Sequence, residues 1–472
     1  MIAVFSKPRV GVCLVALALS VPLGARADDV EIDVEADAPT AVSPSTDSAL
    51  RAQLDALQAR LAALEVAEVT ESAVPAPALP PPLAPKPVTQ AVGVELSGYL
   101  QAQLILSQLS EDEVDPEGDP MNLDRFLVRR ARLRAERAFP YGRAVVELDA
   151  NTVDGPTVTV KRVEASAILP NPKGGPSPGM FTAGLSDIPF GGELPRSSRK
   201  RVFMERSLGS RAFFPSEYDV GASLAGALGP LTYAVAGQNG VPVSTGNSVY
   251  TQEKTAVGRV GFEAGRADRL HVAAGVSYLT GTGFHAGTPA TKAQLLWSDD
   301  NEDGTVTLSE LEAVNGQAAS PSATFARWGV NADLCLTLTT PLGQTELGAE
   351  ATMANNLDRG WLPADPLSTG YDVRELAWTV GLTQEVTRWG ILGLRADRYD
   401  PNSDLFESRR GTFIPTDASV LTLSPVVGVQ YEDTARLLVQ YDYVVDFLGR
   451  DDLAQPIDLP NDQWTLRVQG AF

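Results

Sequence analysis

Apolar and polar residues alternate along the last nine residues of the chain, which end on an aromatic side chain. One face of this segment is apolar: Trp464, Leu466, Val468, Gly470 and Phe472. The opposite face carries Thr465, Arg467, Gln469 and Ala471. A strand with one apolar and one polar face fits a closed sheet that has lipid outside and water inside. We therefore predict that residues 464–472 form the closing strand of an outer-membrane barrel.

The same period of two recurs from residue 92 onward and predicts sixteen strands. They are expected near residues 92–107, 123–139, 142–152, 156–169, 178–187, 218–228, 231–238, 254–264, 268–280, 323–339, 344–354, 373–387, 390–400, 418–431, 435–447 and 461–472. Short turns and long loops alternate between them, as in bacterial outer-membrane barrels, where the short turns face the periplasm. A soluble sandwich would alternate polar and apolar residues too, but its connections need not alternate in length. The predicted fold class is therefore all-β: a sixteen-stranded antiparallel transmembrane β-barrel over residues 92–472.

Short segments of different character precede the predicted barrel. Residues 1–27 combine basic residues, an apolar stretch and the sequence Ala25-Arg26-Ala27, as in a cleaved secretory signal peptide. Residues 28–48 are acidic and expected to be disordered. Residues 69–91 are rich in proline and are expected to form an extended linker.

Residues 49–68, between these segments, carry leucines at a heptad spacing: Leu50, Leu54, Leu57, Leu61 and Leu64. The spacing predicts a coiled coil, which is too short to be stable without a larger body that brings its copies together. We expect a trimeric barrel to do this, with the coiled coil in the periplasm. A lone amphipathic helix is the alternative.

Composition excludes several other classes of protein. The chain has 472 residues and a formal net charge of −21, and phosphate contacts to nucleic acid would need lysine and arginine instead. Beyond the signal peptide, no apolar run reaches the ~20 residues that a spanning helix needs. His271 and His285 are the only histidines and have no nucleophile-bearing motif nearby, so we expect no enzyme activity. Cys335 remains alone once the signal peptide and its Cys13 are removed, which excludes an internal disulfide.

The predicted strand at 123–139 carries three arginines on one face: Arg130, Arg132 and Arg134. Their side chains are spaced by about 7 Å. An arginine on the lipid face at mid-bilayer costs roughly 2–4 kcal/mol, so this face is expected to line the lumen. There the guanidinium groups would form successive binding steps for anions. Alternatively they brace the barrel by pairing with lumenal acids such as Glu147, Asp149, Asp397 and Asp442.

Arg129 breaks this alternation and is expected to reach the headgroups at the extracellular rim. A long loop, residues 188–217, adds further basic residues: Arg196, Arg199, Lys200, Arg201, Arg206 and Arg211. Such a loop is expected to fold inward and narrow the pore. The alternatives are a solvated extracellular loop and one that binds lipopolysaccharide phosphates.

Several motifs in and around this loop are specific in sequence. They are Pro189-Phe190-Gly191-Gly192-Glu193, Ser197-Ser198-Arg199, Phe203-Met204-Glu205-Arg206-Ser207, Tyr218-Asp219-Val220-Gly221, Arg129-Arg130-Ala131-Arg132-Leu133 and Arg395-Ala396-Asp397-Arg398-Tyr399. Together they resemble the phosphate/polyphosphate-selective porin family of the outer membrane. The resemblance implies a trimer of sixteen-stranded barrels, a lumenal arginine ladder and an inward-folded third loop. The family's anion site also uses lumenal lysines, for which this chain offers Lys161 and Lys200.

A separate motif at residues 299–310 matches the spacing of an EF-hand loop. Its ligand positions would be Asp299, Asn301, Asp303, Thr305, Thr307 and Glu310, and Gly304 would allow the sharp turn. Residues 290–297 and 308–314 are the candidates for the entering and exiting helices. We expect this extracellular loop to bind Ca²⁺ as a structural ion; the alternative is an acidic loop without a metal.

These features together predict an outer-membrane porin that passes small hydrophilic solutes and favours anions, phosphate among them. The anion-contacting residues would be Arg130, Arg132, Arg134, Arg196, Arg199, Lys200, Arg201 and Arg206. Outer-membrane lipid, lipopolysaccharide, small anions and two further copies of the chain are the expected partners. The alternative function is a barrel-anchored surface or structural protein with a Ca²⁺-binding loop and little channel activity.

Overall fold

The computed structural model describes residues 93–108, 124–172, 174–240, 254–266, 269–298, 304–409, 411–415, 418–446, 449–450, 456–458 and 460–472. The predicted signal peptide, acidic segment, coiled coil and linker lie outside these ranges. Within them, no helix is long and apolar enough to span a membrane.

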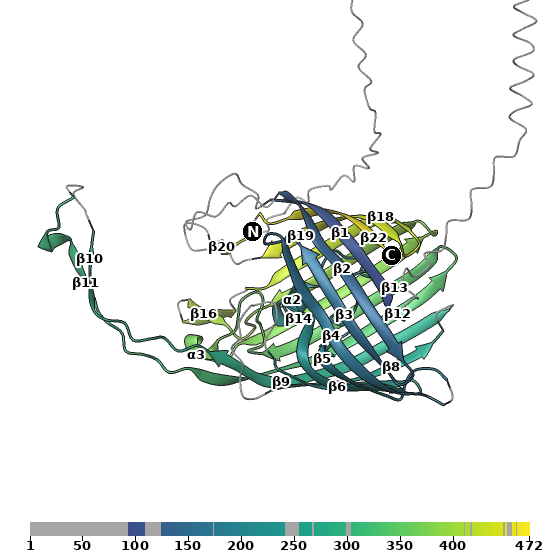
Figure 1. Ribbon diagram of the computed structural model, residues 1–472. Coiled ribbons are helices and arrows are strands. Elements are labelled where there is room, and N and C mark those ends of the chain that lie inside the picture. The colour runs from purple at the N-terminus through teal and green to yellow at the C-terminus, as the bar shows by residue number, and fades with distance from the viewer. Residues whose placement is uncertain are drawn as a thin grey trace, which may run out of the picture. The chain divides into compact units, whose positions relative to one another are not determined.

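Sixteen strands of the described residues form one closed barrel (Figure 1). They are β1 (Glu95–Ser107), β2 (Arg125–Phe139), β3 (Gly142–Asn151), β4 (Thr157–Leu169), β5 (Gly179–Asp187), β6 (Tyr218–Leu228), β7 (Leu231–Gln238), β8 (Thr255–Gly265), β9 (Leu270–His285), β12 (Ala323–Thr340), β13 (Gly343–Asn355), β14 (Arg374–Val386), β15 (Gly390–Asp400), β18 (Val420–Tyr431), β19 (Ala435–Asp446) and β22 (Gln463–Ala471). Each pairs antiparallel with its neighbours along the chain, and β1 pairs with β22 to close the ring. The predicted fold class and all sixteen predicted strands are confirmed.

Smaller elements lie in the long connections. Three two-stranded sheets pair β10 (Gln294–Trp297) with β11 (Leu311–Val314), β16 (Phe406–Arg409) with β17 (Thr412–Pro415), and β20 (Gly449–Arg450) with β21 (Pro456–Ile457). The short helices of the described ranges are α2 (Leu208–Phe213), the 3₁₀ turn η3 (Leu308–Glu310) and α3 (Pro366–Thr369). One barrel strand is longer than expected: β9 continues beyond residue 280 to His285, because this stretch stays paired with β12 as far as Ala323.

The two faces of the wall follow the predicted alternation. In β22, Arg467 is 1% exposed and Val468 is 54% exposed. Exposed aromatic residues lie toward both ends of the outer face: Trp389 stacks on Tyr431, and Trp464 packs at a tilt against the half-buried Tyr441. Aromatic girdles at both rims of an apolar band are typical of barrels in lipid.

Short turns gather at one end of the barrel and long connections at the other. Turns of a few residues join β2 to β3, β6 to β7, β12 to β13, β14 to β15 and β18 to β19. Gly229, in the turn between β6 and β7, has φ of +65°, a left-handed conformation that favours glycine. We call these ends the short-turn end and the long-loop end.

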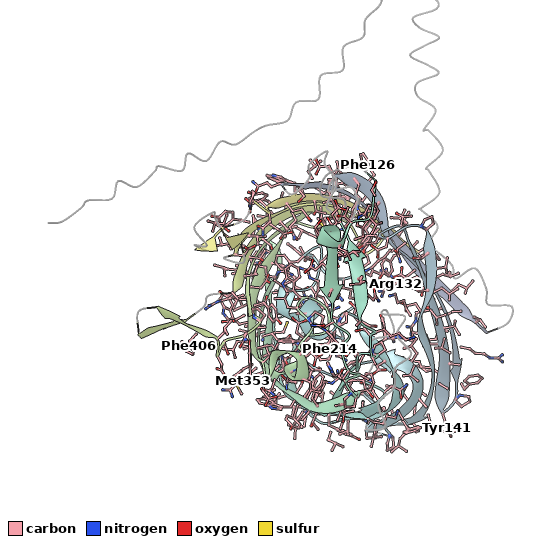
Figure 2. All side chains as sticks on the ribbon, turned by 90° about the vertical axis from the view of Figure 1, so that its left-hand side faces the viewer. Phe126, Arg132, Tyr141, Phe214, Met353 and Phe406 are labelled. Atoms are coloured by element: carbon pink, nitrogen blue, oxygen red, sulfur yellow. The ribbon has the colours of Figure 1, made fainter. Side chains whose placement is uncertain are left out.

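Residues 188–217, here called the third loop, fold into the barrel from the long-loop end. Its apolar side chains pack on inward-facing residues of several strands and form a core inside the lumen: Ile188, Phe190, Leu194, Leu208, Ala212, Phe213 and Phe214 against Ala236, Val257, Leu279, Ala354, Leu357, Tyr399 and Val420. Burying each large apolar side chain contributes roughly 1.5–3 kcal/mol, which favours the inward position over a solvated one. In Figure 2, Phe214 and Arg132 lie inside the ring of strands, whereas Phe126 and Tyr141 lie outside it.

Candidate permeation pathway

The arginine face of β2 lines the lumen as predicted, but one arginine was placed wrongly. The register between β1 and β2 shifts at Gln101, so that Arg130 and Val128 face consecutive residues of β1 and Arg129 occupies a β-bulge. Arg129 therefore also points inward and forms two hydrogen bonds to Glu205 of the third loop, at 2.8 and 3.2 Å. The expected contact with headgroups is wrong because a bulge places two consecutive side chains on the same face.

Arg132 is the most heavily contacted of these arginines. Its guanidinium nitrogens lie 3.3 Å from Glu147, 3.4 Å from Asp149 and 3.6 Å from Glu217. It donates a hydrogen bond of 3.1 Å to the Tyr218 hydroxyl, and its guanidinium carbon lies 5.9 Å from the ring centroids of both Tyr99 and Tyr218. Arg132 is thus a fixed part of the wall, held by three carboxylates and two rings.

Arg130 and Arg129 share a single carboxylate with a third arginine. Glu205 accepts from Arg130 at 2.7 and 3.1 Å and from the Nη2 of Arg467 at 3.1 Å. Its backbone carbonyl accepts from Arg395 at 2.7 Å. Burial disfavours the charged form of Glu205, but the neighbouring arginines outweigh burial and hold its pKa well below the usual value. Glu205 therefore ties the third loop to β2, β15 and β22.

The acids predicted to brace the ladder do so only in part. Arg134 pairs with Glu147 at 3.4 Å and with Glu136 at 2.6 Å. Asp397 instead lies 3.2 Å from Arg395, which belongs to the same strand, β15. Asp442 accepts hydrogen bonds from Ser424 and Gln440. The prediction that these two acids pair with the ladder is therefore wrong, because β15 and β19 are separated from β2 by two or more strands of the ring.

A second charged cluster surrounds Glu217, the last residue of the third loop. Arg201 pairs with Glu217, and the Nε of Arg206 lies 3.5 Å from it. Burial opposes ionisation of Glu217, but Arg201, Arg206 and Arg132 prevail and lower its pKa to about 2. Burial lowers the pKa of Arg206 to about 10, and this side chain also donates to the carbonyls of Ser210 and Phe214.

The remaining loop cations lie toward the short-turn end. Arg196 forms two hydrogen bonds to Glu346 of β13, one of them 2.8 Å long. Arg199 donates to the carbonyl of Asp433, which lies in the short turn between β18 and β19. Lys200 is exposed. The eight predicted anion residues are therefore split between the ladder, the Glu217 cluster and the short-turn end.

Two cavities lie between the third loop and the wall formed by β2 to β5. The outer cavity, of about 430 Å³, opens toward the long-loop end and reaches Asn151 and Trp361. The inner cavity, of about 340 Å³, lies nearer the start of β1 and includes Ser97 and Gly98. Arg132, Glu217 and Tyr218 line both cavities, so the two meet at these three side chains.

Sequence reasoning missed Tyr218 and Glu217 as parts of this junction, and Tyr99 as part of the inner cavity beside it. Nothing local marks them, because they come from β1, β6 and the end of the third loop. Two pairs of adjacent cations in the sequence, Arg129-Arg130 and Lys161-Arg162, could have indicated the bulges that shape this part of the wall. An alternating strand can turn both members of such a pair inward only through a bulge.

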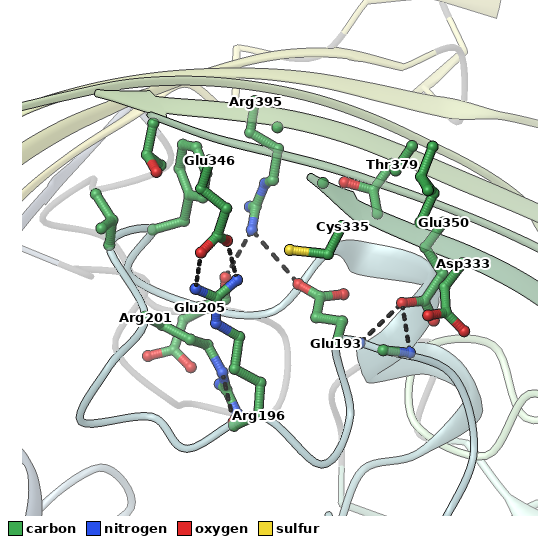
Figure 3. Close-up of a pocket in the computed structure, with 18 residues that line it drawn as sticks. Glu193, Arg196, Arg201, Glu205, Asp333, Cys335, Glu346, Glu350, Thr379 and Arg395 are labelled. Carbon is green, nitrogen blue, oxygen red and sulfur yellow. Dashed lines mark hydrogen bonds and ion pairs between the residues drawn. The ribbon is translucent and has the colours of Figure 1, made fainter. Parts of the chain in front are cut away.

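A third cavity, of about 280 Å³, lies between the third loop and strands β12 to β15 (Figure 3). Its carboxylates are already used within the fold. Glu350 accepts from the backbone amides of Gly192 and Glu193 at 3.0 and 2.8 Å, and Glu346 pairs with Arg196. Cys335 also lines this cavity as a free thiol. We assign this region to anchoring the loop.

The EF-hand-like segment is only partly described: Asp299, Asn301 and Asp303 lie outside the described residues. The segments on either side of it do not form the expected helices. They form strands β10 and β11, because their backbones pair with each other as a hairpin. Gly304 has φ of +67°, as the sharp turn requires. Glu310 accepts from the Thr307 amide at 3.2 Å and from the Trp297 indole at 3.4 Å. No cluster of potential metal ligands occurs among the described residues.

No protein-family model matches the chain, and no curated protein matches it. Solved structures with a similar fold include the outer membrane channel DcaP of Acinetobacter baumannii (12% identity, TM-score 0.48, covering 81% of this chain and 99% of that one). An anion-selective porin from Comamonas acidovorans has 12% identity, a TM-score of 0.46 and coverage of 80% and 99%. The outer membrane protein OmpT of Vibrio cholerae, in its trimer form, has 12% identity, a TM-score of 0.45 and coverage of 80% and 99%. By its own topology the chain is a closed sixteen-stranded antiparallel β-barrel.

Proposed function

We propose that this chain is an outer-membrane porin that passes small hydrophilic solutes by diffusion and catalyses no reaction. The observation that carries the proposal is the pair of cavities in series, one toward each end of the barrel, which meet at Arg132. The third loop packs on β7 to β9 and β13 to β18, and this path runs between the loop and β2 to β5. An apolar outer wall with an inward loop is the arrangement that a diffusion channel in lipid needs.

We further propose that the path favours anions, because cations outnumber acids along it. Six basic and three acidic side chains line the outer cavity. The inner cavity is lined by five basic side chains, among them Arg134 and Arg199, and by three acidic ones. A narrow space with walls of low dielectric concentrates ions of opposite charge. Guanidinium groups match the oxygen geometry of phosphate, which makes phosphate the preferred candidate among small anions.

Planar-bilayer recording of the full-length protein tests this proposal. We expect single-channel steps and a reversal potential in a KCl gradient that reports chloride preference. Adding phosphate should reduce the chloride current in a saturable way. A reversal potential that reports potassium preference would contradict the anion path, and a simple linear loss of current would contradict phosphate binding.

The second candidate is a barrel-anchored surface or structural protein with little conductance. The density of contacts between the third loop and the wall favours it, since Glu205 alone contacts three arginines. Detergent-solubilised protein that inserts into bilayers but yields no current steps would support this candidate. In either case we propose a homotrimer whose segment at 49–68 associates in the periplasm, which chemical cross-linking of the intact protein tests.

We also propose that the hairpin of β10 and β11 binds Ca²⁺ through residues 299–310. The positive φ of Gly304 supports the turn geometry that such a loop uses. The carboxylate of Glu310 is already directed toward Thr307, the neighbouring ligand position. Calorimetric titration of the intact protein with Ca²⁺ should show one binding event that Asp299→Ala removes. The absence of heat in the parent protein would end this proposal.

A further inference from the structure

The connection between β9 and β12 forms a ribbon that extends beyond the barrel, here called the arm (residues 286–298 and 304–322). Backbone hydrogen bonds join its two sides, and β10 and β11 lie near its tip. The residues at 288–298 and at 312–322 are all exposed. In Figure 1, β10 and β11 stand well apart from the barrel. The arm is therefore an extended structure that no other described part of the chain covers.

One face of the hairpin at the tip of the arm is apolar. Leu295 of β10 lies opposite Ala313 of β11. Two positions along, Trp297 lies opposite Leu311, and residues two apart in a strand share a face. We call these four residues the apolar face of the tip; Leu295 is 66% exposed and Trp297 41% exposed. A two-stranded hairpin alone is marginally stable in water, so a surface that covered this face would stabilise it.

A second set of exposed apolar side chains lies at the long-loop end, in the connection between β13 and β14. These side chains, here called the rim residues, are Trp361, Leu362, Leu367 and Tyr371. The backbone that carries them is fixed. The carboxylate of Asp358 accepts hydrogen bonds of 2.9–3.0 Å from the amides of residues 360–362, and Asp365 caps α3. The rim residues are therefore held in place at the mouth of the barrel and can receive a partner without a rearrangement of their backbone.

The rim residues of the same chain lie beside the base of the arm. The imidazole Nδ1 of His285, the last residue of β9, lies 2.6 Å from the Oδ2 of Asp365. The side chain of Asn356 donates a hydrogen bond of 3.1 Å to the carbonyl of Ala326 in β12. At about 3.3 Å per residue, residues 286–298 carry the tip about 40 Å from this base. A sixteen-stranded barrel is only roughly 30 Å across, from its strand spacing and tilt. The arm therefore carries its tip past its own rim residues and far enough to reach those of a neighbouring barrel.

The tip of the arm is acidic, and an unpaired cation lies beside the rim residues. The sequence between Lys292 and Arg327 contains no basic residue and six acidic ones: Asp299, Asp300, Glu302, Asp303, Glu310 and Glu312. Arg211 of α2 is exposed, lines the outer cavity together with Trp361, and forms no ion pair among the described residues. Asp365, an acid of the rim, is already bonded at the base of the arm. The acids of the tip would thus find a counter-charge at the mouth of a neighbouring copy.

We propose that the arm docks on a second copy of this chain, with the apolar face of its tip on the rim residues of the neighbour. Each copy gives one arm and receives one, so the contact runs head to tail and closes in a ring such as the proposed homotrimer. The arm then links the copies on the extracellular side of the membrane. This inference goes beyond the proposed porin function, because it assigns a role to the arm that does not depend on conduction.

Site-specific photo-crosslinking in intact outer membranes tests this docking. A full-length chain with a benzophenone amino acid in place of Leu295 is co-expressed with an unmodified chain that carries a different tag, at a fixed Ca²⁺ concentration. We expect a product that carries both tags, with its crosslink at residues 361–371 of the second chain. The matched control carries the benzophenone at Gln294, on the opposite face of β10, and should give much less of this product.

Subunit exchange in detergent measures what the contact contributes to the oligomer. Leu295→Ser and Leu367→Ser remove an apolar side chain from either partner, and each should raise the exchange rate roughly tenfold. The double variant should exchange little faster than either single variant, because both substitutions act on the same contact. Gln294→Ser is the control and should exchange as the wild type does. Urea unfolding of each variant should match the wild type, which separates loss of the contact from a defect in the barrel.

Several results would overturn the docking. Crosslinks confined to the chain that carries the benzophenone would show that the arm folds back on its own barrel. Crosslinks to lipopolysaccharide alone would show that the tip lies on lipid, and no crosslink at all would leave the tip without a partner. Wild-type exchange rates in both Ser variants would show that the contact contributes nothing to the oligomer. Each of these results would leave the porin function standing, because the bilayer recordings test it separately.

Discussion

At the scale of single residues, the lumen is organised by carboxylates that each hold several arginines. Glu205 contacts Arg129, Arg130 and Arg467, and Glu217 contacts Arg132, Arg201 and Arg206. Both acids belong to the third loop, whereas four of the six arginines belong to the wall. Each acid therefore fixes the loop and also determines which wall cations stay free. Removing one acid should affect both properties.

Glu205→Gln should destabilise the barrel, because three guanidinium groups would lose their common carboxylate and two of them, Arg130 and Arg467, would stay buried. Removing one partner of a buried ion pair costs about 3–5 kcal/mol, and the partial exposure of Glu205 reduces this to about 2–3 kcal/mol. Urea unfolding in detergent, followed by tryptophan fluorescence, measures the loss. Asp433→Asn removes the 83%-exposed partner of Arg436 and should cost below about 1 kcal/mol. Equal losses in the two variants would argue against the Glu205 cluster.

The cluster around Glu217 predicts a pH dependence of stability. The folded pKa of about 2 lies below the usual value of about 4.3 for an unfolded glutamate. A depressed folded pKa gives stability that is complete above the unfolded pKa and is lost as pH falls through the folded pKa. The unfolding free energies of wild type and Glu217→Gln should therefore differ by a constant amount above pH 5 and converge between about pH 4 and pH 2. A difference that persists unchanged at pH 2 would show that Glu217 stabilises by packing alone.

At the scale of elements, the alternation of polar and apolar residues was enough to predict the barrel strands. Two kinds of feature were not predicted from the sequence: the β-bulges and the hairpin in a long loop. Each wall residue faces either lipid or the lumen, so the polarity of its side chain indicates which way the side chain points. All sixteen strands were predicted on this basis. Bulges at Arg129 and Lys161 insert one extra residue and reverse the assignment locally, which no count of period two can reveal. The hairpin of β10 and β11 was missed because an EF-hand motif implies helices, whereas long-range pairing decides the actual structure.

The bulge in β2 predicts which positions react from water. In a Cys335→Ser background, Arg129→Cys should react with a membrane-impermeant methanethiosulfonate reagent about as fast as Arg130→Cys. Leu133→Cys should react much more slowly, because Leu133 is exposed on the outer face and a thiolate is disfavoured in lipid. Mass spectrometry of protein in liposomes measures the labelled fraction over time. If Arg129→Cys were as slow as Leu133→Cys, the side chain would face lipid and the bulge assignment would fail.

At the scale of the whole molecule, the third loop converts a wide barrel into a narrow and one-sided path. Its apolar residues pack on β7 to β9 and β13 to β18, and three of its charged residues, Glu205, Arg206 and Glu217, line the cavity against β2 to β4. The sequence indicated a long basic loop, and the family resemblance implied that it folds inward. The position of the remaining path depends on contacts between residues more than a hundred positions apart, such as Gly192 with Glu350 and Met204 with Gln440. Such contacts leave no local pattern in the sequence.

The junction of the two cavities gives the last prediction. Arg132→Ala removes one of the three side chains shared by both cavities and leaves Glu147, Asp149 and Glu217 without this cation. The shortened side chain should widen the junction and raise the single-channel conductance. The exposed carboxylates should at the same time shift the reversal potential toward potassium. Arg134→Ala, which lines only the inner cavity, should shift the reversal potential in the same direction with little rise in conductance. If both variants raised conductance equally, the narrowest point of the path would lie elsewhere than at Arg132.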